Sequence, residues 1–244
     1  MSNETRVKVA ILAAGYGTRL EQDLASPSNV THRHLIGTPK PLLPVMGVPL
    51  ITHWITHFAS LTHPPAQVVV VVNDLHYHKY EAWQRSLPSP SPPVLLLNEG
   101  SRHNEGRRGA VACIKLVTDT DTDACWVVVG GDTLLHPSFS VGDMVSLMEQ
   151  LQKRQQQMQH QQGEQCPVSI IVSTSVRDED VSKGGIIEVD GQGKVVSFLE
   201  KPEPHATPSR LQSPCVYLLH HLHLHLLQEF LDAKAKLLTF LSSV

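Results

Sequence analysis

Residues 7–20 read VKVAILAAGYGTRL, an apolar run that ends in a turn with two glycines. The run from Val7 to Leu12 is rich in β-branched residues, which is typical of a buried strand. Gly15 and Gly17 follow it, and a backbone without side chains lets N–H groups approach phosphate oxygens closely. The stretch therefore predicts a buried strand, a glycine turn and an anion-binding loop.

Apolar runs alternate with helical patterns along the first half of the chain. Further strands are expected over 67–73, 94–97 and 126–129. Helices are expected over 49–58, around Tyr77, Tyr80 and Trp83, and over 109–117, with a proline-rich loop over 86–93. This alternation predicts an α/β fold with a mostly parallel, three-layer sheet.

The second half of the chain adds shorter patterns. A strand is expected over 167–172, and the segment 185–198 predicts a hairpin that turns at 190–193. We interpret 149–165 as a helix end running into a glutamine-rich, flexible insertion, because this segment can bury little apolar surface. No internal repeat is visible, and we interpret 1–244 as a single domain.

The composition is that of an ordinary globular protein. The 244 residues carry a formal net charge of −3 and are 41% hydrophobic, which indicates neither a nucleic-acid nor a membrane partner. No apolar stretch approaches the roughly 20 residues that span a bilayer, and no signal peptide is visible, so we expect a cytoplasmic location. The cysteines form no CxxC pair and are expected to be free thiols: Cys113, Cys125, Cys166 and Cys215.

The turn GYGTRL (15–20) differs from the glycine pattern of dinucleotide-binding folds. Those folds use G-x-G-x-x-G, whereas this chain has Leu20 at the last position and Arg19 before it. An arginine beside the glycines suits a polyphosphate, because its guanidinium donates two parallel hydrogen bonds to phosphate oxygens. On this motif alone, a solvated Arg19 on a surface turn is an equally good interpretation.

A second motif, PKPLLPV (39–45), presents one lysine among prolines and leucines. Pro39, Pro41 and Pro44 restrict φ and stiffen the backbone, so Lys40 is held at a defined place. A lysine on a flexible surface helix would more often be a solvated charge. The two motifs together favour a binding role for Arg19 and Lys40.

In this order, LxxGxGTRL (12–20) and KPLLPV (40–45) resemble the signature of the sugar-phosphate nucleotidylyltransferase family, which includes the glucose-1-phosphate thymidylyltransferases. The resemblance implies a Rossmann-like, three-layer mixed sheet of the nucleotide-diphospho-sugar transferase type. It implies an enzyme that joins a sugar 1-phosphate to a nucleoside monophosphate taken from a nucleoside triphosphate (NTP), with release of pyrophosphate. NTP and sugar 1-phosphate are then the expected partners and Mg²⁺ the expected cofactor, and a homo-oligomer is allowed.

The resemblance also assigns roles to single residues. Arg19 and Lys40 match catalytic cations that hold the phosphates, and Asp132, at the end of WVVVGGD, matches the aspartate that binds Mg²⁺. Its place at the carboxyl end of a predicted strand favours this role over that of a turn residue. The expected nucleotide-binding residues are Leu12, Ala13, Gly15, Gly17 and Thr18, with Asn104 and Gly109 on the base side.

The same resemblance places the sugar phosphate on the segment 183–202. Gly185 is expected to lie against the sugar ring, Glu200 to accept its hydroxyl groups and Lys201 to pair with its phosphate. Tyr217 matches a tyrosine of a following strand, and Cys215 stands where the family has a glycine. Without the other motifs, Glu200 and Lys201 would be interpreted as a surface ion pair.

Two departures from the family pattern leave other functions open. Arg19 and Lys40 lie 21 positions apart, and we interpret this long spacing as a tolerated loop insertion rather than a flap over the nucleotide. The family's late metal-binding aspartate has no counterpart, since Asp232 lies in a helical pattern. The alternatives are a chain truncated at its C-terminus, a non-catalytic nucleotide-sugar-binding regulator, and a cytidylyltransferase for a phosphorylated alcohol such as phosphocholine.

The run HHLHLH (220–225) raises the question of a second metal site. Imidazole is a common zinc ligand, and alternate residues of a strand share one face. No cysteine or carboxylate is spaced with these histidines along the sequence. We therefore interpret the run as an exposed polar face opposite leucines.

Overall fold

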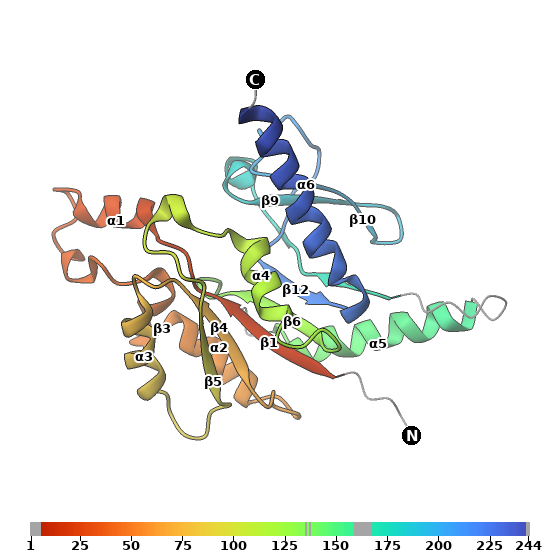
Figure 1. Cartoon of the computed structure of the whole chain (residues 1–244), viewed down its shortest axis with the longest axis horizontal. Helices are drawn as coiled ribbons and strands as arrows, with labels where there is room; N and C mark the ends of the chain where they lie inside the picture. The colour runs from red at the N-terminus through yellow and green to blue at the C-terminus, as the bar shows by residue number, and fades with distance from the viewer. Residues whose placement is uncertain (1–5, 135, 137, 159–166, 243–244) are drawn as a thin grey trace.

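The computed structural model describes residues 6–134, 136, 138–158 and 167–242, and its centre is a six-stranded mixed sheet (Figure 1). In spatial order the strands are β5 (Val94–Asn98), β4 (Val68–Val72), β1 (Val7–Leu12), β6 (Cys125–Gly130), β12 (Val216–Leu219) and β7 (Ile170–Ile171). The first four are parallel, and β12 runs antiparallel to both of its neighbours. The predicted mixed, mostly parallel sheet is confirmed.

Helices cover both faces of this sheet, which confirms the three-layer prediction. One core contains buried residues of α2 (Leu50–Ala59), α3 (Tyr77–Arg85) and α5 (Val141–Met158), and the other contains residues of α4 (Ala110–Thr118) and the start of α6 (His225–Ser242). The five valines of β4 are all buried and alternate between the two cores. This two-sided burial explains why the strand is apolar throughout rather than alternating.

A smaller four-stranded sheet carries the segment assigned above to the sugar. Its strands, in spatial order, are β10 (Val195–Glu200), β9 (Gly185–Val189), β11 (Leu211–Gln212) and β8 (Thr174–Ser175). The predicted hairpin is confirmed: β9 and β10 pair antiparallel, and the Asp190 carboxylate accepts hydrogen bonds from the backbone N–H groups of Gln192 and Lys194, both at 2.9 Å. An aspartate that bonds to the backbone of its own turn closes the hairpin.

Short elements connect the larger ones. They are α1 (Thr18–Ala25), η1 (Arg33–Leu35), η2 (Lys40–Leu42), β2 (Pro44–Val45), β3 (Val48–Pro49), η3 (Asn104–Gly106), η4 (Asp178–Lys183) and η5 (His221–His223). Helix α1 was not predicted, because its sequence TRLEQDLA is largely polar. The segment between Arg19 and Lys40 folds back on itself, because Gly37 N donates a 2.8 Å hydrogen bond to Glu21 Oε1. Lys79 Nζ also donates a hydrogen bond to Gly37 O.

Three further sequence predictions agree with the structure only in part. The strand expected over 167–172 is ordered as a strand only at Ile170–Ile171. The segment 149–165 is helical as far as Met158, and its remainder lies outside the described residues. Cys113, Cys125 and Cys215 are free thiols, whereas Cys166 also lies outside the described residues.

None of the helices in the described ranges is both long enough and apolar enough to cross a lipid bilayer.

Candidate active site

The loop between β1 and α1 exposes backbone N–H groups at the carboxyl edge of the sheet. Gly17 precedes α1 with φ of 63°, a left-handed conformation that glycine adopts without the steric cost of a Cβ atom. The N–H groups of the first turn of an α-helix have no intrahelical partner, and here no side chain caps the helix start. Such a helix start attracts anions, and this is the local structure expected from Gly15, Gly17 and Thr18.

Buried polar side chains fix the backbone of this loop from beneath. Tyr80 Oη donates a 3.0 Å hydrogen bond to Ala13 O, and Asn73 Nδ2 donates one of the same length to Ala14 O. Both Tyr80 and Asn73 are fully buried. Burial, with a smaller contribution from the Asp132 carboxylate, raises the pKa of Tyr80 above its ordinary value, so its hydroxyl remains a donor. These two hydrogen bonds fix the start of the loop at Ala13 and Ala14.

The structure brings Lys40 and Asp132 together from positions 92 residues apart. Lys40 Nζ lies 2.8 Å from Asp132 Oδ2, and both side chains are about half exposed. Lys40 begins η2, and the neighbouring Pro41 is buried, so the lysine stands on an anchored turn as its proline-rich surroundings predict. Trp54 Nε1 donates a 2.9 Å hydrogen bond to Thr133 O, which fixes the loop that carries the aspartate.

Gly131 places Asp132 directly beside the anion-binding loop. Its N–H donates a 2.9 Å hydrogen bond to Leu12 O, which extends the pairing of β1 and β6 by one residue. A Cβ atom at Gly131 would lie 3.1 Å from that same carbonyl oxygen and 3.3 Å from Ala13 Cβ. A larger residue would push the strands apart, so this glycine sets the approach of Asp132 to the loop.

Arg19 stands on the exposed surface of the first turn of α1. Within the described ranges, no carboxylate forms an ion pair with its guanidinium. The structure thus leaves this cation available for an anionic ligand next to the helix start.

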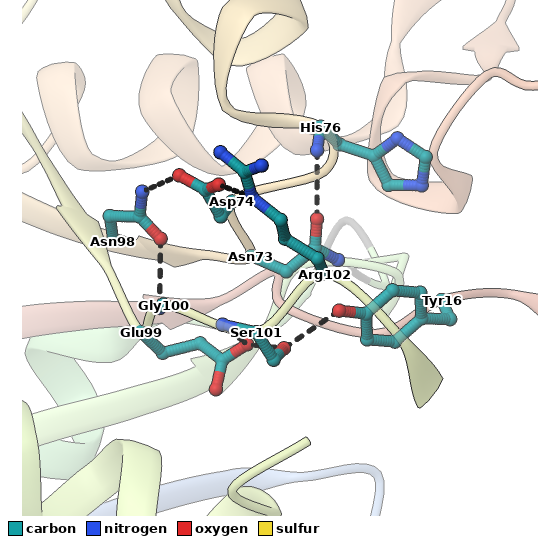
Figure 2. A network of polar contacts seen from close by, with 9 residues as sticks. All are labelled: Tyr16, Asn73, Asp74, His76, Asn98, Glu99, Gly100, Ser101 and Arg102. Atoms are coloured by element: carbon teal, nitrogen blue, oxygen red, sulfur yellow. Dashed lines mark hydrogen bonds and ion pairs between the residues drawn. The ribbon is translucent and has the colours of Figure 1, made fainter. Parts of the chain in front are cut away.

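A polar network that the sequence did not predict lies beside this loop, where β4 and β5 end (Figure 2). Tyr16 Oη, from the loop, is 2.7 Å from Ser101 Oγ, which donates in turn to the buried Glu99 carboxylate. Arg108 Nε donates 2.7 Å to Glu99 O and lies 4.0 Å from its carboxylate. A buried carboxylate needs such partners, so the network joins the segment after β5 to the loop after β1.

The outer part of the same network centres on Asp74, which follows β4 (Figure 2). Asn98 Nδ2 and Arg102 Nε donate to its two carboxylate oxygens at 2.7 and 2.5 Å. These hydrogen bonds, first that of Asn98 and then that of Arg102, lower the pKa of the Asp74 carboxyl. Asp74 therefore fixes the start of the segment that is predicted to contact the nucleotide base.

Asn104 and Gly109, the two predicted base-side residues, frame η3 and the start of α4. Arg107 Nη1 donates a 3.0 Å hydrogen bond to Asn104 Oδ1, which fixes the Asn104 side chain through its carbonyl group. Gly109 precedes α4 with φ of 85°, a conformation that strains any residue with a Cβ atom. Both residues stand on the segment that Glu99 and Ser101 join to the Tyr16 loop.

At the smaller sheet and the neighbouring strand β12, the structure connects three of the four predicted sugar-side residues. Ser213 N donates to Gly185 O at 2.9 Å, and Ser213 Oγ is 3.1 Å from Tyr217 Oη. Burial, then the neighbouring Cys215, and to a smaller extent Glu200, raise the pKa of Tyr217. Gly185, Tyr217 and Glu200 thus belong to one region.

A side chain that the sequence did not single out also lies in this region. A Cβ atom built on Gly185 would lie 2.3 Å from Phe198 Cζ, so the phenyl ring covers this glycine. The fourth predicted residue, Lys201, has φ of 48° and pairs with the adjacent Glu200 at 3.4 Å. Both charged side chains are exposed, so this contact alone contributes little stability.

The segment 213–215 links the sugar side to Asp132. Thr133 Oγ1 donates to Pro214 O at 2.8 Å, and Gly130 N donates to Cys215 O at the same distance. Cys215 has φ of 59°, which agrees with its position in place of a family glycine. Burial, with a smaller effect of the Asp132 carboxylate, raises the pKa of the Cys215 thiol to about 11.

No counterpart of a second metal-binding aspartate is found near the end of the described chain. Asp232 lies on α6, where its carboxylate accepts a 2.7 Å hydrogen bond from Gln228 Nε2. Among the residues that the structure describes, no group of three or more metal-ligating side chains includes Asp132. Any divalent cation at Asp132 would therefore take most of its ligands from water or a bound molecule, as Mg²⁺ commonly does.

Comparison with solved structures identifies the fold. A UDP-glucose pyrophosphorylase complexed with UDP-glucose is similar to this chain with a TM-score of 0.64 and 21% identity, over 92% of this chain and 80% of that one. A putative glucose-1-phosphate thymidylyltransferase from Bacillus anthracis, in complex with a sucrose, gives a TM-score of 0.59 and 18% identity, over 90% and 73%. CMP:2-keto-3-deoxy-manno-octonic acid synthetase complexed with CTP gives 0.52 and 13%, over 91% and 76%.

The sequence comparisons give the family. A search of curated proteins found no significant match. The family model described as nucleotidyl transferase matches residues 8–244, which include both N-terminal motifs, Asp132 and the smaller sheet. The chain therefore belongs to the nucleotidyl transferase family.

Proposed function

We propose that the chain transfers a nucleotidyl group from an NTP to a sugar 1-phosphate and releases pyrophosphate. The observation that carries this proposal is the Lys40–Asp132 pair beside the uncapped start of α1. A cation, a carboxylate and free backbone N–H groups then surround one place at the carboxyl edge of the sheet, where α/β folds bind their ligands. This combination suits a polyphosphate with a bound metal ion better than a neutral ligand.

In the proposed reaction, the chain mainly positions the reactants and neutralises charge. A phosphate oxygen of the sugar 1-phosphate attacks the α-phosphorus of the NTP, the bond from that phosphorus to the bridging oxygen of the β-phosphate breaks, and pyrophosphate leaves with the electron pair. No general base is required, because a phosphate monoester is already ionised near neutral pH. Arg19 and Lys40 would hold the charge that develops on the leaving pyrophosphate.

Binding of an NTP would change the partner of Lys40. In the structure its ammonium group is paired with Asp132, and both side chains are accessible. A triphosphate would draw Lys40 to its oxygens and leave the carboxylate to a Mg²⁺ ion. Mg²⁺ bound there would supply positive charge that stabilises the phosphate oxygens.

The smaller sheet is the proposed binding region of the sugar phosphate. Glu200 would accept hydroxyl groups of the sugar, and Lys201 would pair with its phosphate once it leaves its exposed contact with Glu200. Tyr217 and Gly185 support this assignment because Ser213 joins them to each other. Phe198, over Gly185, supplies the apolar surface on which a sugar ring can stack.

A second candidate is a regulator that binds a nucleotide sugar without turnover. The observation that favours it is that, among the described residues, Asp132 belongs to no group of three or more metal-ligating side chains. A third candidate is a cytidylyltransferase whose acceptor is a phosphorylated alcohol such as phosphocholine. In that case Glu200 and Lys201 would not bind a sugar phosphate.

A substrate panel distinguishes these candidates. Pyrophosphate release is measured with each common NTP against sugar 1-phosphates, phosphocholine and no acceptor, in the presence of Mg²⁺. The proposal predicts release that requires both an NTP and a sugar 1-phosphate and that is lost in Asp132→Asn. Release with phosphocholine alone would favour the cytidylyltransferase, and calorimetric binding of a nucleotide sugar without any release would favour the regulator.

A further inference from the structure

A cluster of metal-ligating side chains lies at the opposite end of the central sheet from Asp132. Cys125 is the first residue of β6, whereas Asp132 follows its last residue. β12 runs antiparallel to β6, with Leu219 opposite Trp126, so the residues that follow β12 return to the start of β6. This topology brings His220 and His221 to Cys125, about 95 positions earlier in the sequence.

The distances within the cluster suit a metal ion. Cys125 Sγ lies 3.8 Å from His221 Nδ1, and the ring centroids of His220 and His221 are 4.3 Å apart. One ligand atom from each of the three residues lies within 4.8 Å of the other two. With zinc–sulfur and zinc–nitrogen bonds of about 2.3 and 2.0 Å, a tetrahedral site places its sulfur and nitrogen ligands about 3.5 Å apart.

The cluster is built into the fold rather than spread on a surface. Cys125 is 1% exposed and His220 is 6% exposed. His220 N donates a 3.0 Å hydrogen bond to Ser169 Oγ, so backbone contacts fix the chain between β12 and η5. The prediction of alternate histidines on one exposed strand face is therefore wrong, because the strand ends at Leu219 and the run folds into η5 and the start of α6.

We propose that Cys125, His220 and His221 bind a single transition-metal ion with a preference for thiolate and imidazole, and that Zn²⁺ fits this ligand set best. One thiolate and two imidazoles are ligands that zinc prefers, whereas Mg²⁺ prefers oxygen ligands. Three protein ligands leave the fourth position of a tetrahedral ion to water. The ion would tie the start of β6 to η5 and so fix the place where α6 begins.

His223, which could supply a fourth ligand, is directed elsewhere. His223 Nδ1 is 2.8 Å from Ser169 Oγ, and its ring centroid is 6.1 Å from that of His220. His225 Nδ1 is likewise 2.8 Å from Leu222 O. Neither residue belongs to the three-residue cluster, so His225 is a suitable control for nonspecific binding to the histidine run.

Protonation of the three ligands is compatible with metal binding. Burial, together with the nearby His221 and His223, lowers the pKa of His220 to about 4, so this imidazole is neutral at neutral pH. Burial raises the pKa of Cys125, but a coordinated metal ion deprotonates a thiol outright. Leu222 N donates a 3.2 Å hydrogen bond to His220 Nδ1. An ion bound at Nδ1 would replace this bond, and an ion bound at Nε2 would move the ring proton to Nδ1 and break it, so binding costs this contact in either case.

The test uses the full chain after removal of metals with a chelator. Zn²⁺ affinity is measured by competition with a chromophoric chelator, and Co²⁺ is used as a spectroscopic substitute. We expect one tight site per chain and a thiolate-to-cobalt charge-transfer band. Removal of a residue that only hydrogen-bonds to a metal ligand typically lowers metal affinity about 10–100-fold. Because Cys125 and His221 would be ligands themselves, we expect Cys125→Ser and His221→Asn to weaken Zn²⁺ binding more than about 100-fold.

Matched variants separate this site from nonspecific binding. Cys113→Ser removes another buried thiol, and His225→Asn removes a histidine outside the cluster; both should keep the site. Circular dichroism checks that each variant folds. If Cys125→Ser does not fold, His221→Asn still tests the site, because His221 lies on η5 and is partly exposed. Zn²⁺ affinity that is unchanged in His221→Asn, or bound Co²⁺ without a charge-transfer band, would overturn the proposal and identify an adventitious ion only.

Discussion

Lys40 and Asp132 form an ion pair whose side chains are 51% and 45% exposed. At such exposure, solvent screens the attraction, and ion pairs of this kind contribute about 0–1 kcal/mol to the free energy of unfolding. The pair is thus a weak structural contact. Its accessibility is instead what a site needs if both charges are to exchange partners when a substrate binds.

The substitution Asp132→Asn separates these two roles. Asp132→Asn should change the free energy of unfolding by less than about 1 kcal/mol and reduce pyrophosphate release by more than about 100-fold. Urea unfolding and the release assay measure the two quantities. Asp119→Asn is the matched control, since Asp119 is another exposed aspartate, paired with Lys115, and should retain activity. A large loss of stability in Asp132→Asn would assign the aspartate a structural role.

Tyr80 differs from Lys40 and Asp132, because it is buried and we expect its hydroxyl group to contribute to stability. Its hydroxyl group is buried and donates to Ala13 O in the anion-binding loop. Tyr80→Phe leaves that carbonyl oxygen without its donor, so we predict a loss of about 1–3 kcal/mol in the free energy of unfolding and a higher KM for the NTP. Tyr77→Phe should do neither, since its hydroxyl makes no hydrogen bond within the described chain. Unchanged KM in Tyr80→Phe would show that the loop needs no such support.

Among the helices and strands, those that bury an apolar face or their whole length could be predicted from the sequence. β4 and β6 are buried along their length, and α2 has an apolar face, so each has a clear pattern. Helix α1 was missed because its position is decided by Gly17 and by contacts with distant segments. β7 is short because only two residues pair with β12, which apolar character alone cannot reveal.

The β9–β10 hairpin yields a prediction for substrate binding. Gly185→Ala would introduce a Cβ atom into the space of the Phe198 ring, 2.3 Å from its Cζ atom, and displace this half-exposed ring. We predict a higher KM for the sugar 1-phosphate with an unchanged KM for the NTP. The control is Gly191→Ala, in the open turn of the same hairpin, where a Cβ atom meets nothing within 4 Å. Equal effects of both substitutions on the two KM values would contradict the assignment.

The contact between the start of β1 and the loop before β6 predicts a pH effect. Lys8 Nζ lies 2.8 Å from Asp121 Oδ2, and Arg6 pairs with the other oxygen. The Lys8 hydrogen bond, then the Lys8 and Arg6 charges, lower the pKa of Asp121. The unfolded chain therefore binds the proton first, so the stabilisation is present above about pH 4 and disappears as pH falls through the folded-state pKa. Urea unfolding at several pH values should show a shallower acid decline in Asp121→Asn than in the unmodified chain.

At the scale of the whole molecule, the fold assembles sites from segments that are far apart in the sequence. Motif residues with a strong local signature, such as Arg19, Lys40 and Asp132, can be proposed as site residues from the sequence alone. Contacts that depend on the sheet order cannot, and Cys125 with His220 is an example. Glu99 was missed for the same reason, because its partners become visible only where β5 ends beside the loop after β1.

Identification of the reaction product tests the proposed nucleotidyl transfer most directly. The full chain is incubated with Mg²⁺, an NTP and a sugar 1-phosphate from the pair that releases pyrophosphate, and the nucleotides are analysed by mass spectrometry. The proposed function predicts a nucleoside diphosphate sugar formed in equal amount to pyrophosphate, and none with Lys40→Ala. Pyrophosphate accompanied only by nucleoside monophosphate would contradict it, because the chain would then hydrolyse the NTP without transferring the nucleotidyl group to a sugar.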